Sequence, residues 1–388
     1  MSQDHGLEPV WIANNSEFAS LSQQWLERAS QPSFALAIDT EFERRTTYYP
    51  TFALLQVFDG SSVYIIDPQK VSSNQAFKEL CQDPRVIKVM HAGKEDLEVL
   101  FHSWDCKLDS VFDTQVAYNF LIGESSIGYA ALVKKLLNID LDKEETQSDW
   151  MARPLTQSQV QYAANDVIYL YQIYLQLSQK IENIKAYRLF KAETEEVCEL
   201  SIAPNDPAVE YRRAKDVTLL NSRQLGLFKE LYIWREQLAK ENNRTRNHIL
   251  RDQQLAEIAI KRPTSRQKLG QISQIHPGSV RRYGELLIQK ILDYKDDSGS
   301  LPVVINPREL KDLKSLIKLL ESKIKEVAKD FDVTPNIMAS KRMLKKFAVC
   351  YLTGESQAAA WAGWRGNLLM PYFEPVLSQF ATSNLTST

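Results

Sequence analysis

The sequence predicts an α/β domain with a mixed sheet, followed by two small all-α domains. Three observations support this fold class: short apolar runs alternate with helical patterns in the first half, strand-like runs stop at about residue 183, and turn-forming segments follow at 201–210 and 296–302. A chain of 388 residues has room for two or three domains. We therefore expect domains over residues 1–205, 206–298 and 299–388.

The mixed sheet is predicted from the order of its strands. The runs FALAID (34–39), FALLQVFD (52–59) and VYIID (63–67) are β-rich and closely spaced, as the strands of a meander are. A fourth run, VIKVMH (86–91), is flanked by helical patterns. Strands that first follow one another and then alternate with helices give a sheet of mixed direction. We expect the helices at about 72–82, 93–103, 113–122, 127–138 and 156–180.

The rest of the chain is helical in pattern. The segment LFKELYIWREQLAKE has apolar residues at helical spacing, and helical stretches follow it on both sides of Pro263. Beyond the turn-rich segment 296–302, helical spacing of apolar residues appears again in LKDLKSLIKLLESKIKEVAKDF and MASKRMLKKFAVC. A cluster formed by Trp361 and Trp364 follows. We interpret these tryptophans as core residues of the last domain.

Composition is that of a globular protein, with 44% hydrophobic and 25% charged residues. No apolar run reaches the ~20 residues that cross a bilayer, and the N-terminus lacks the basic and apolar regions of an export signal. The cysteines are far apart and have no neighbouring histidine, which disfavours zinc and disulfide frameworks and favours a reducing cytoplasm. They are Cys81, Cys106, Cys198 and Cys350.

Charge is distributed unevenly along the chain. Residues 1–200 carry a net charge of −12, residues 211–300 carry +8 and residues 301–388 carry +4. An acidic first half joined to a basic second half fits a carboxylate-rich metal site with attached modules that bind a polyanion. Charged surface residues that have no binding role explain such an imbalance equally well.

Acidic residues occur in three segments that we expect to converge. Asp39 and Glu41 close the first strand as D-T-E, and residues two apart on a strand point to one face. In VMHAGKEDLEVL (89–100), Glu95 and Asp96 begin a helix that follows a buried-type strand. In QYAANDVIYLYQIY (161–174), Tyr162 and Asp166 lie one turn apart on a helix. Each element alone is a weak signal, because strand ends and first helical turns often carry acids.

Taken together, the acids predict a metal site. Four carboxylates can hold two divalent cations ~3.5–4 Å apart, one cation activating water and the other stabilising the leaving oxygen. Hard oxygen ligands without histidine or cysteine favour Mg²⁺ or Mn²⁺ over zinc. A tyrosine hydroxyl beside such a site can position the attacking water.

These segments resemble a known family. IDTEFERRTTYYP, VMHAGKEDLEVLF and YAANDVIYLY are similar, in order and spacing, to the three exonuclease motifs of the ribonuclease D family. The resemblance covers essentially the whole chain. It implies a DEDD 3′-5′ exonuclease domain with a ribonuclease-H-like fold, followed by two HRDC-type helical domains, with residues 213–295 similar to the first and 305–388 to a divergent second copy.

The resemblance also implies roles for particular residues. Asp39, Glu41, Asp96 and Asp166 would be the catalytic acids that bind two cations, Mg²⁺ or Mn²⁺, with Asp96 aligning to the motif in preference to Glu95. Tyr162 marks the subgroup that has tyrosine where its sister subgroup has histidine.

Candidate substrate contacts are less sharply indicated. Arg44 and Lys94 lie near the motifs, and we expect them to reach phosphate. We expect Phe42 or Tyr48 to stack on the terminal base, although a place in an aromatic core explains both of these residues as well. His91 ends a strand near Asp96, and a role in the core explains it as well. Asp113 either supports a metal ligand or caps a helix. The densest basic stretch of the helical region contains Arg244, Arg246, Lys261, Arg262, Arg266 and Lys268, which bind RNA phosphate or form a solvated face.

The predicted function is hydrolytic removal of 3′-terminal nucleotides from structured RNA, with release of 5′-mononucleotides. The resemblance implies trimming of tRNA precursors and other small RNAs by a cytoplasmic enzyme. Nothing in the sequence indicates a membrane or an obligate protein partner, so we expect a monomer. Two rival hypotheses stay open: a DNA exonuclease of the same chemistry, which recognition of the 2′-hydroxyl would distinguish, and a non-catalytic nucleic-acid-binding scaffold.

Overall fold

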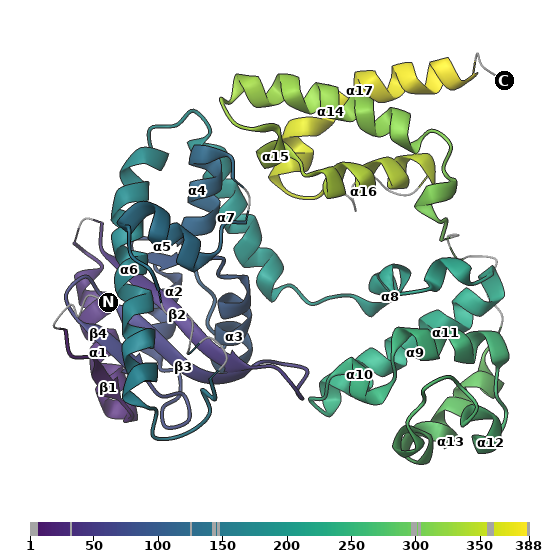
Figure 1. The fold of residues 1–388 in the computed structure, drawn as a ribbon, viewed down its shortest axis with the longest axis horizontal. Helices are drawn as coiled ribbons and strands as arrows, with labels where there is room; N and C mark the ends of the chain where they lie inside the picture. The colour runs from purple at the N-terminus through teal and green to yellow at the C-terminus, as the bar shows by residue number, and fades with distance from the viewer. Residues whose placement is uncertain are drawn as a thin grey trace. The chain divides into compact units, whose positions relative to one another are not determined.

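The computed structural model describes residues 7–31, 33–124, 126–141, 145, 148–295, 301, 304–354 and 361–385 (Figure 1). Contacts within the chain divide it into two units. The first comprises Met1–Glu43, Thr51–Ala203 and Lys311–Thr388, and the second comprises Arg44–Pro50 and Pro204–Leu310. The expected boundary between residues 298 and 299 lies outside the described residues.

The first unit is built on a six-stranded mixed sheet. Its strands are β1 (Val10–Ile12), β2 (Ala35–Glu43), β3 (Thr51–Phe58), β4 (Val63–Ile66), β5 (Ile87–Met90) and β6 (Val111–Asp113). Their order is β1-β4-β3-β2-β5-β6. The meander β2-β3-β4 is antiparallel, whereas β1 pairs with β4, β5 with β2, and β6 with β5 in parallel. The predicted mixed sheet is therefore confirmed.

Helices cover both faces of this sheet (Figure 1). Their bounds are α1 (Asn15–Arg28), α2 (Gln75–Gln82), α3 (Lys94–Trp104), α4 (Thr114–Ile122), α5 (Tyr129–Leu137), α6 (Gln157–Ile181) and α7 (Tyr187–Ile202). One core contains buried residues of α1, α2 and α3, and the other contains those of α4, α5 and α6. Residues of β2 alternate between them: Ala35 and Ala37 face the α6 side, and Leu36 and Ile38 the α1 side.

The small residues of β2 let a long helix approach the strand. Ala35 and Ala37 are fully buried, and Ala163 and Ala164 of α6 lie in the same core. Because β2 continues beyond this core to Asp39 and Glu41, the packing of alanines brings α6 beside the acidic end of the strand. The sequence pattern thus determines which helix faces the acids.

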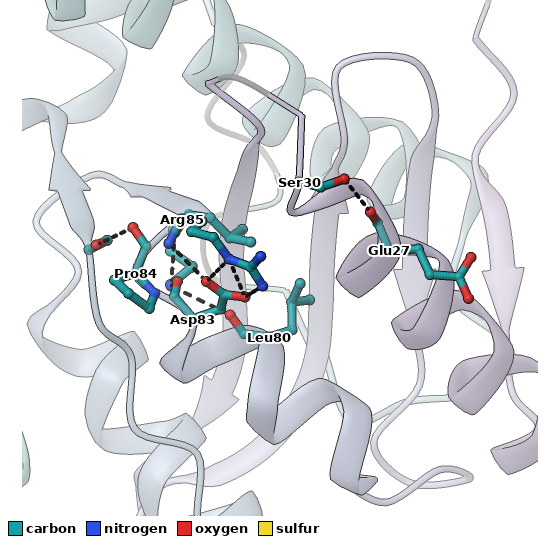
Figure 2. A network of polar contacts seen from close by, with 9 residues as sticks. Glu27, Ser30, Leu80, Asp83, Pro84 and Arg85 are labelled. Atoms are coloured by element: carbon teal, nitrogen blue, oxygen red, sulfur yellow. Dashed lines mark hydrogen bonds and ion pairs between the residues drawn. The ribbon is translucent and has the colours of Figure 1, made fainter.

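A tight turn at Asp83–Arg85 leads into β5. The Asp83 carboxylate accepts hydrogen bonds from the Arg85 backbone N–H (2.9 Å) and guanidinium (2.5 Å), and Figure 2 shows these side chains facing each other. The buried Lys88 ammonium donates to the backbone oxygens of Asp83 and Val86, at 2.9 Å each. These contacts satisfy a lysine that faces the core from within the strand.

The second unit is helical. It contains α8 (Pro207–Glu210), α9 (Ser222–Glu241), α10 (Arg246–Ile249), α11 (Asp252–Lys261), α12 (Arg266–Leu269) and α13 (Pro277–Asp293), with 3₁₀ turns at Tyr211–Arg213, Val217–Leu219 and Pro307–Glu309. Its core includes Phe228, Leu231 and Leu255. Residues 44–50, the tip of the hairpin between β2 and β3, belong to this unit by their contacts.

The last helices belong to the first unit. They are α14 (Leu313–Asp330), α15 (Pro335–Met338), α16 (Lys341–Leu352) and α17 (Trp364–Leu385). The Trp364 indole Nε1–H donates to Glu193 of α7 at 2.7 Å, and the Arg365 guanidinium pairs with the same carboxylate at 2.5 Å. Trp361 is buried against Phe347 and Phe373, as expected for a core residue, whereas Trp364 lies in the contact with α7.

The strands and helices predicted for the first domain are present, and further elements accompany them. Strands β1 and β6, each of three residues, and helices α1 and α7 were not predicted. Helix α2 begins at Gln75 rather than near residue 72, because the Asn74 side chain caps it. No helix in the described ranges combines the length and apolar character required to cross a membrane.

Candidate active site

Three of the predicted acids converge at one place. Asp39 and Glu41 lie within β2, which continues to Glu43 instead of closing at these residues as expected, and Asp166 lies in α6. One carboxylate oxygen from each lies within 4.8 Å of the other two. No basic side chain in the described part of the chain forms an ion pair with these residues. Three convergent carboxylates without a cationic partner make a natural binding site for hard cations.

Asp96 lies beside this cluster and is held by the strand that carries it. Its Oδ1 accepts a hydrogen bond of 2.5 Å from the hydroxyl of Thr40, the residue between Asp39 and Glu41. Its negative charge raises the pKa of Asp39 and of Glu41. The structure therefore brings together all four acids that the sequence indicated, with Glu95, the competing acid, left exposed.

Burial of the acids perturbs their titration. The pKa of Asp39 is raised well above its usual value by desolvation and then by the charges of Asp96, Asp166 and Glu41. Desolvation, followed by repulsion from neighbouring acids, raises the pKa of Glu41 to about 8. Burial alone raises the pKa of Asp166 to about 7 and is the main cause that raises that of Asp96 to about 6. A bound cation would relieve the desolvation and repulsion that disfavour the ionised acids.

Tyr162 lies at the site, one turn before Asp166. A hydrogen bond from Tyr162 opposes the rise in the pKa of Asp166. The indole of Trp150 packs on the Tyr162 ring, with centroids 5.9 Å apart. The hydroxyl of the partly buried Tyr129 donates to the backbone oxygen of Asp166, which ties this turn of α6 to α5. Tyr162 is half-buried and so keeps access to the site.

Asp113 fills both of the roles that the sequence left open. Its carboxylate accepts from the backbone N–H groups of Gln115 and Val116 and thereby caps α4. It also accepts from the N–H groups of Ala92 (3.1 Å) and Gly93 (3.0 Å). These two residues form the turn from β5 into α3, so Asp113 holds the turn that presents Asp96.

Gln56 was missed by the sequence analysis. It lies on β3 directly opposite Asp39, and residues opposite each other in an antiparallel pair share a face. The side chain is fully buried, and neither atom of its amide has a hydrogen-bond partner within the described ranges. A glutamine inside the apolar run FALLQVF was the signal that could have revealed it.

The predicted substrate contacts lie in varied surroundings. Lys94 is exposed at the first residue of α3, and Phe42 packs against the core on the α1 side of the sheet. Both ring nitrogens of His91 already have partners, Thr114 Oγ1 at 2.9 Å and the Ile127 oxygen at 3.2 Å.

The remaining predicted contacts belong to the second unit. Arg44 donates to the Tyr48 oxygen at 3.3 Å, and Arg246 pairs with buried Glu236 at 2.8 Å. Arg262 lies over the Tyr294 ring. Arg244 and Lys268 are exposed, and Arg244 lines a cavity.

The chain matches two protein families. Residues 9–182 match the 3′-5′ exonuclease family, and residues 224–291 match the HRDC domain. The first match contains all four acids and Tyr162. The second falls within the helical unit that follows the nuclease domain.

Curated relatives extend over most of the chain. Ribonuclease D of Pseudomonas paraeruginosa is 39% identical over 87% of this chain and 89% of its own length. Ribonuclease D of Escherichia coli K12 is 30% identical over 89% of this chain and 93% of its own.

Solved structures share the fold. The crystal structure of Escherichia coli RNase D, described as an exoribonuclease involved in structured RNA processing, superposes with a TM-score of 0.85 at 27% identity and covers 96% of this chain and 100% of that one. The catalytic core of RRP6 from Trypanosoma brucei, with a TM-score of 0.60 at 24% identity, covers 78% of this chain and 82% of that one and shows the fold alone.

Proposed function

The chain belongs to the ribonuclease D family, and from this premise we propose that it trims the 3′ ends of tRNA precursors and other small structured RNAs. It is a 3′-5′ exoribonuclease that hydrolyses the terminal phosphodiester and releases 5′-mononucleotides. The observation that carries this function is the convergence of Asp39, Glu41 and Asp166 within 4.8 Å, with Asp96 beside them, inside the exonuclease match.

The acids fit divalent cations. They are partly or fully buried, they lack basic partners in the described ranges, and their pKa values are raised, as expected where positive charge is needed to hold them ionised. We propose that Asp39, Glu41, Asp96 and Asp166 bind two cations, Mg²⁺ or Mn²⁺, because all the donors are hard oxygens. When bound, such ions lower the pKa of water and stabilise negative charge on the phosphate and leaving oxygens.

The chain's own residues orient the reaction. Tyr162, fixed by Trp150 and hydrogen-bonded to Asp166, would orient the attacking water through its hydroxyl. The water oxygen loses a proton as it bonds to phosphorus, the bond from phosphorus to the 3′ oxygen breaks, and a proton passes to the leaving 3′ oxygen to give the released 3′-hydroxyl. Asp113 acts at a distance by holding the turn that presents Asp96. Lys94, exposed on the first turn of that helix, is our candidate for contact with the substrate phosphate.

The helical domains are proposed to supply affinity for RNA. Residues 206–298 contain the HRDC match, and we propose residues 299–388 as a second, divergent domain of this type. We further propose that the enzyme acts as a monomer in the cytoplasm, where its four free cysteines suit a reducing compartment.

A time course with a tRNA precursor that carries a 3′ extension, and with a matched DNA, tests this function in Mg²⁺ and in EDTA. We expect stepwise, Mg²⁺-dependent shortening of the RNA with release of mononucleotides. Asp166→Asn and Tyr162→Phe should each lower kcat by roughly 10²–10³-fold, the loss typical of removing one group that acts in the transition state. Asp140→Asn is the matched control, because the Asp140 side chain is 83% exposed and its ion pair among the described residues is with Lys134 at the surface.

The outcomes separate the rival functions. Faster digestion of DNA would assign the same site to DNA processing. Binding of RNA without any digestion would favour a scaffold, and full activity of Asp166→Asn would disprove the assigned site.

A further inference from the structure

A cavity of about 580 Å³ lies beside the edge strand β6, within the first unit. Its lining comes from the segments that lead into β5 and β6 and from helices α6 and α7 (Figure 1). The Ser110 hydroxyl donates to the Pro84 oxygen at 2.9 Å and so joins the two segments that precede the strands. Sites for small organic molecules typically have volumes of ~300–1,000 Å³. The cavity is therefore large enough for an organic ligand.

This cavity lies at the opposite end of the parallel strands from the catalytic acids. Strands β2, β5 and β6 run in the same direction. Asp39 and Glu41 follow the part of β2 that pairs with β5, whereas Pro84 and Asp109 precede β5 and β6. A ligand of this cavity is therefore distinct from the RNA end that reaches the acids.

The charged side chains of the cavity are mostly acidic. Asp109, Glu182, Glu195 and Glu199, which we call the acidic rim, are exposed, and Lys191 is the one basic side chain among the described lining residues. Within the described ranges, no ion pair neutralises any acid of the rim. Uncompensated negative charge repels phosphate and concentrates cations. The occupant that this charge favours is therefore cationic.

The acidic rim is too dispersed to hold one metal ion. Among the described residues, the catalytic cluster is the group of three or more side chains whose ligand atoms come within 4.8 Å of one another. Glu195 and Glu199 lie one turn apart on α7, a spacing of ~5–6 Å between β-carbons, and Asp109 and Glu182 come from other elements. Separate carboxylates of this kind suit a ligand that carries several positive charges at intervals.

The apolar part of the lining is rich in aromatic rings. The Phe112 ring packs edge-on against Tyr174, with centroids 5.0 Å apart, and against Phe190, at 5.4 Å. Tyr187 stacks on Phe190 with centroids 6.2 Å apart. Aromatic rings contact methylene groups favourably and attract cations to their faces. Aliphatic segments between the positive charges of a ligand would pack against these rings.

Tyr174 adds a polar group that the protein leaves unused. Its side chain is only 5% exposed, yet its hydroxyl makes no hydrogen bond in the described part of the chain. Burial raises the pKa of Tyr174 to about 12, and the nearby Tyr171, Glu182 and Tyr187 add to the rise. Since Glu182 and Tyr187 also line the cavity, the hydroxyl lies on its side of the ring. Buried tyrosine hydroxyls usually have a partner, and an ammonium group would supply one.

We propose that this cavity binds a linear polyamine, an aliphatic chain that carries several ammonium groups. The ammonium groups pair with the acidic rim, one of them donates to the Tyr174 hydroxyl, and the methylene groups pack on the aromatic rings. A peptide strand fits less well, because α7 already lies against the edge of β6. Phe190 of this helix belongs to the core on one face of the sheet, and Val197 packs against the core on the other.

The test compares two variants of the full chain that lose equal charge. Glu195→Gln/Glu199→Gln removes two acids of the rim, and Glu17→Gln/Glu27→Gln removes two exposed acids of α1. Binding of spermidine is measured by calorimetry in excess Mg²⁺, which competes for the catalytic acids. The wild type should bind one spermidine per chain with submillimolar Kd. The rim variant should bind about tenfold more weakly, as loss of two ion pairs predicts, and the α1 variant should match the wild type.

Tyr174→Phe tests the hydroxyl alone. Without ligand its Tm should equal that of the wild type, because the hydroxyl has no hydrogen bond to lose. Its affinity for spermidine should fall by about tenfold, the effect of one hydrogen bond to a charged group. Spermidine should raise the Tm of the wild type and of the α1 variant more than that of Tyr174→Phe. Butylamine, with a similar aliphatic chain but one charge, should bind at least tenfold more weakly than spermidine.

Three results would overturn the polyamine site, and none of them depends on nuclease activity. The first is the absence of saturable spermidine binding by a folded wild type. The second is equal weakening in the rim and α1 variants, which would assign the binding to diffuse surface charge. The third is tighter binding of tetralysine than of spermidine, lost in the rim variant, which would make the cavity a docking site for a basic protein segment.

Discussion

Gln56 is a buried polar residue next to the catalytic acids, and the acids do not explain why it is there. A buried amide without a hydrogen-bond partner typically costs about 1–3 kcal/mol, and this one lies directly across the strand pair from Asp39. A fold selected for stability alone would place an apolar residue there, as it does at the flanking Leu55 and Val57. We infer that Gln56 orients the Asp39 carboxylate when the site is loaded with cations and substrate.

Replacing Gln56 by leucine should separate stability from activity. Gln56→Leu removes the unpartnered amide at similar volume, so Tm should rise or stay level. Loss of the orienting group should lower kcat by about tenfold, the low end of the ~10–100-fold loss typical of residues that orient a metal ligand. Thermal melts and single-turnover cleavage measure the two effects. Unchanged kcat would show that Gln56 is no more than a tolerated polar residue of the core.

At this scale the sequence indicated the acids but not their neighbours. Asp39, Glu41, Asp96 and Asp166 could be predicted because each falls in a recognisable motif of the sequence. The bond from Thr40 to Asp96 and the register of Gln56 with Asp39 depend on how strands pair and helices dock. Spacing along the chain does not reveal cross-strand partners.

The tip of the hairpin between β2 and β3, residues 44–50, makes contacts with the second unit that the sequence did not predict. Tyr48 was expected to stack on the terminal base, yet its hydroxyl lies 3.3 Å from Glu236 and its ring faces Arg246. The Asn243 side-chain oxygen accepts from the N–H groups of Tyr48 (3.1 Å) and Tyr49 (3.0 Å). The tip is therefore fastened to helical residues of the second unit, although it continues the strand that carries the catalytic acids.

Asn243→Ala should loosen this tip. Two backbone donors lose their acceptor, at a combined cost of about 1 kcal/mol, which corresponds to roughly fivefold faster amide exchange. Hydrogen exchange measured by mass spectrometry on peptides that cover residues 46–49 detects the change. Asn242→Ala is the control, because in the described part of the chain the Asn242 side chain bonds to the Leu238 oxygen of the preceding helix and not to the tip. Equal exchange in both variants would show that the tip is held by other contacts.

Among the elements, the clarity of the hydrophobic period determined what could be predicted. Helix α6 was predicted within a residue at each end, since 25 residues show the helical period clearly and Thr156 with Gln159 forms a capping box. Strand β6 has three residues, too few for alternation to be visible. Helix α7 was missed because its acidic run hides a narrow buried face that includes Phe190 and Thr194.

On the scale of the whole molecule, the acidic first half of the sequence contains a cluster of charge that the fold tolerates poorly without cations. The pKa values of Glu41 (about 8), Asp166 (about 7) and Asp96 (about 6) all lie above those of exposed carboxyls. Between pH ~4 and 8 the folded protein therefore binds more protons than the unfolded chain, so its stability falls as pH rises. The cation-free protein should be most stable below pH 5 with respect to these groups, and should lose that contribution by pH 8.

Melting curves in EDTA from pH 5 to 8 test this dependence on the intact protein. The wild type should show a steeper fall in Tm with rising pH than Asp166→Asn, which removes one titrating acid and its repulsion of Asp39 and Glu41. Added Mg²⁺ should raise the Tm of the wild type most at pH 8, because cations bind the ionised carboxylates there. Asp140→Asn should follow the wild type at every pH, since that carboxyl is exposed. Parallel curves for wild type and Asp166→Asn, with no response to Mg²⁺, would mean that the acids neither repel one another nor hold a cation.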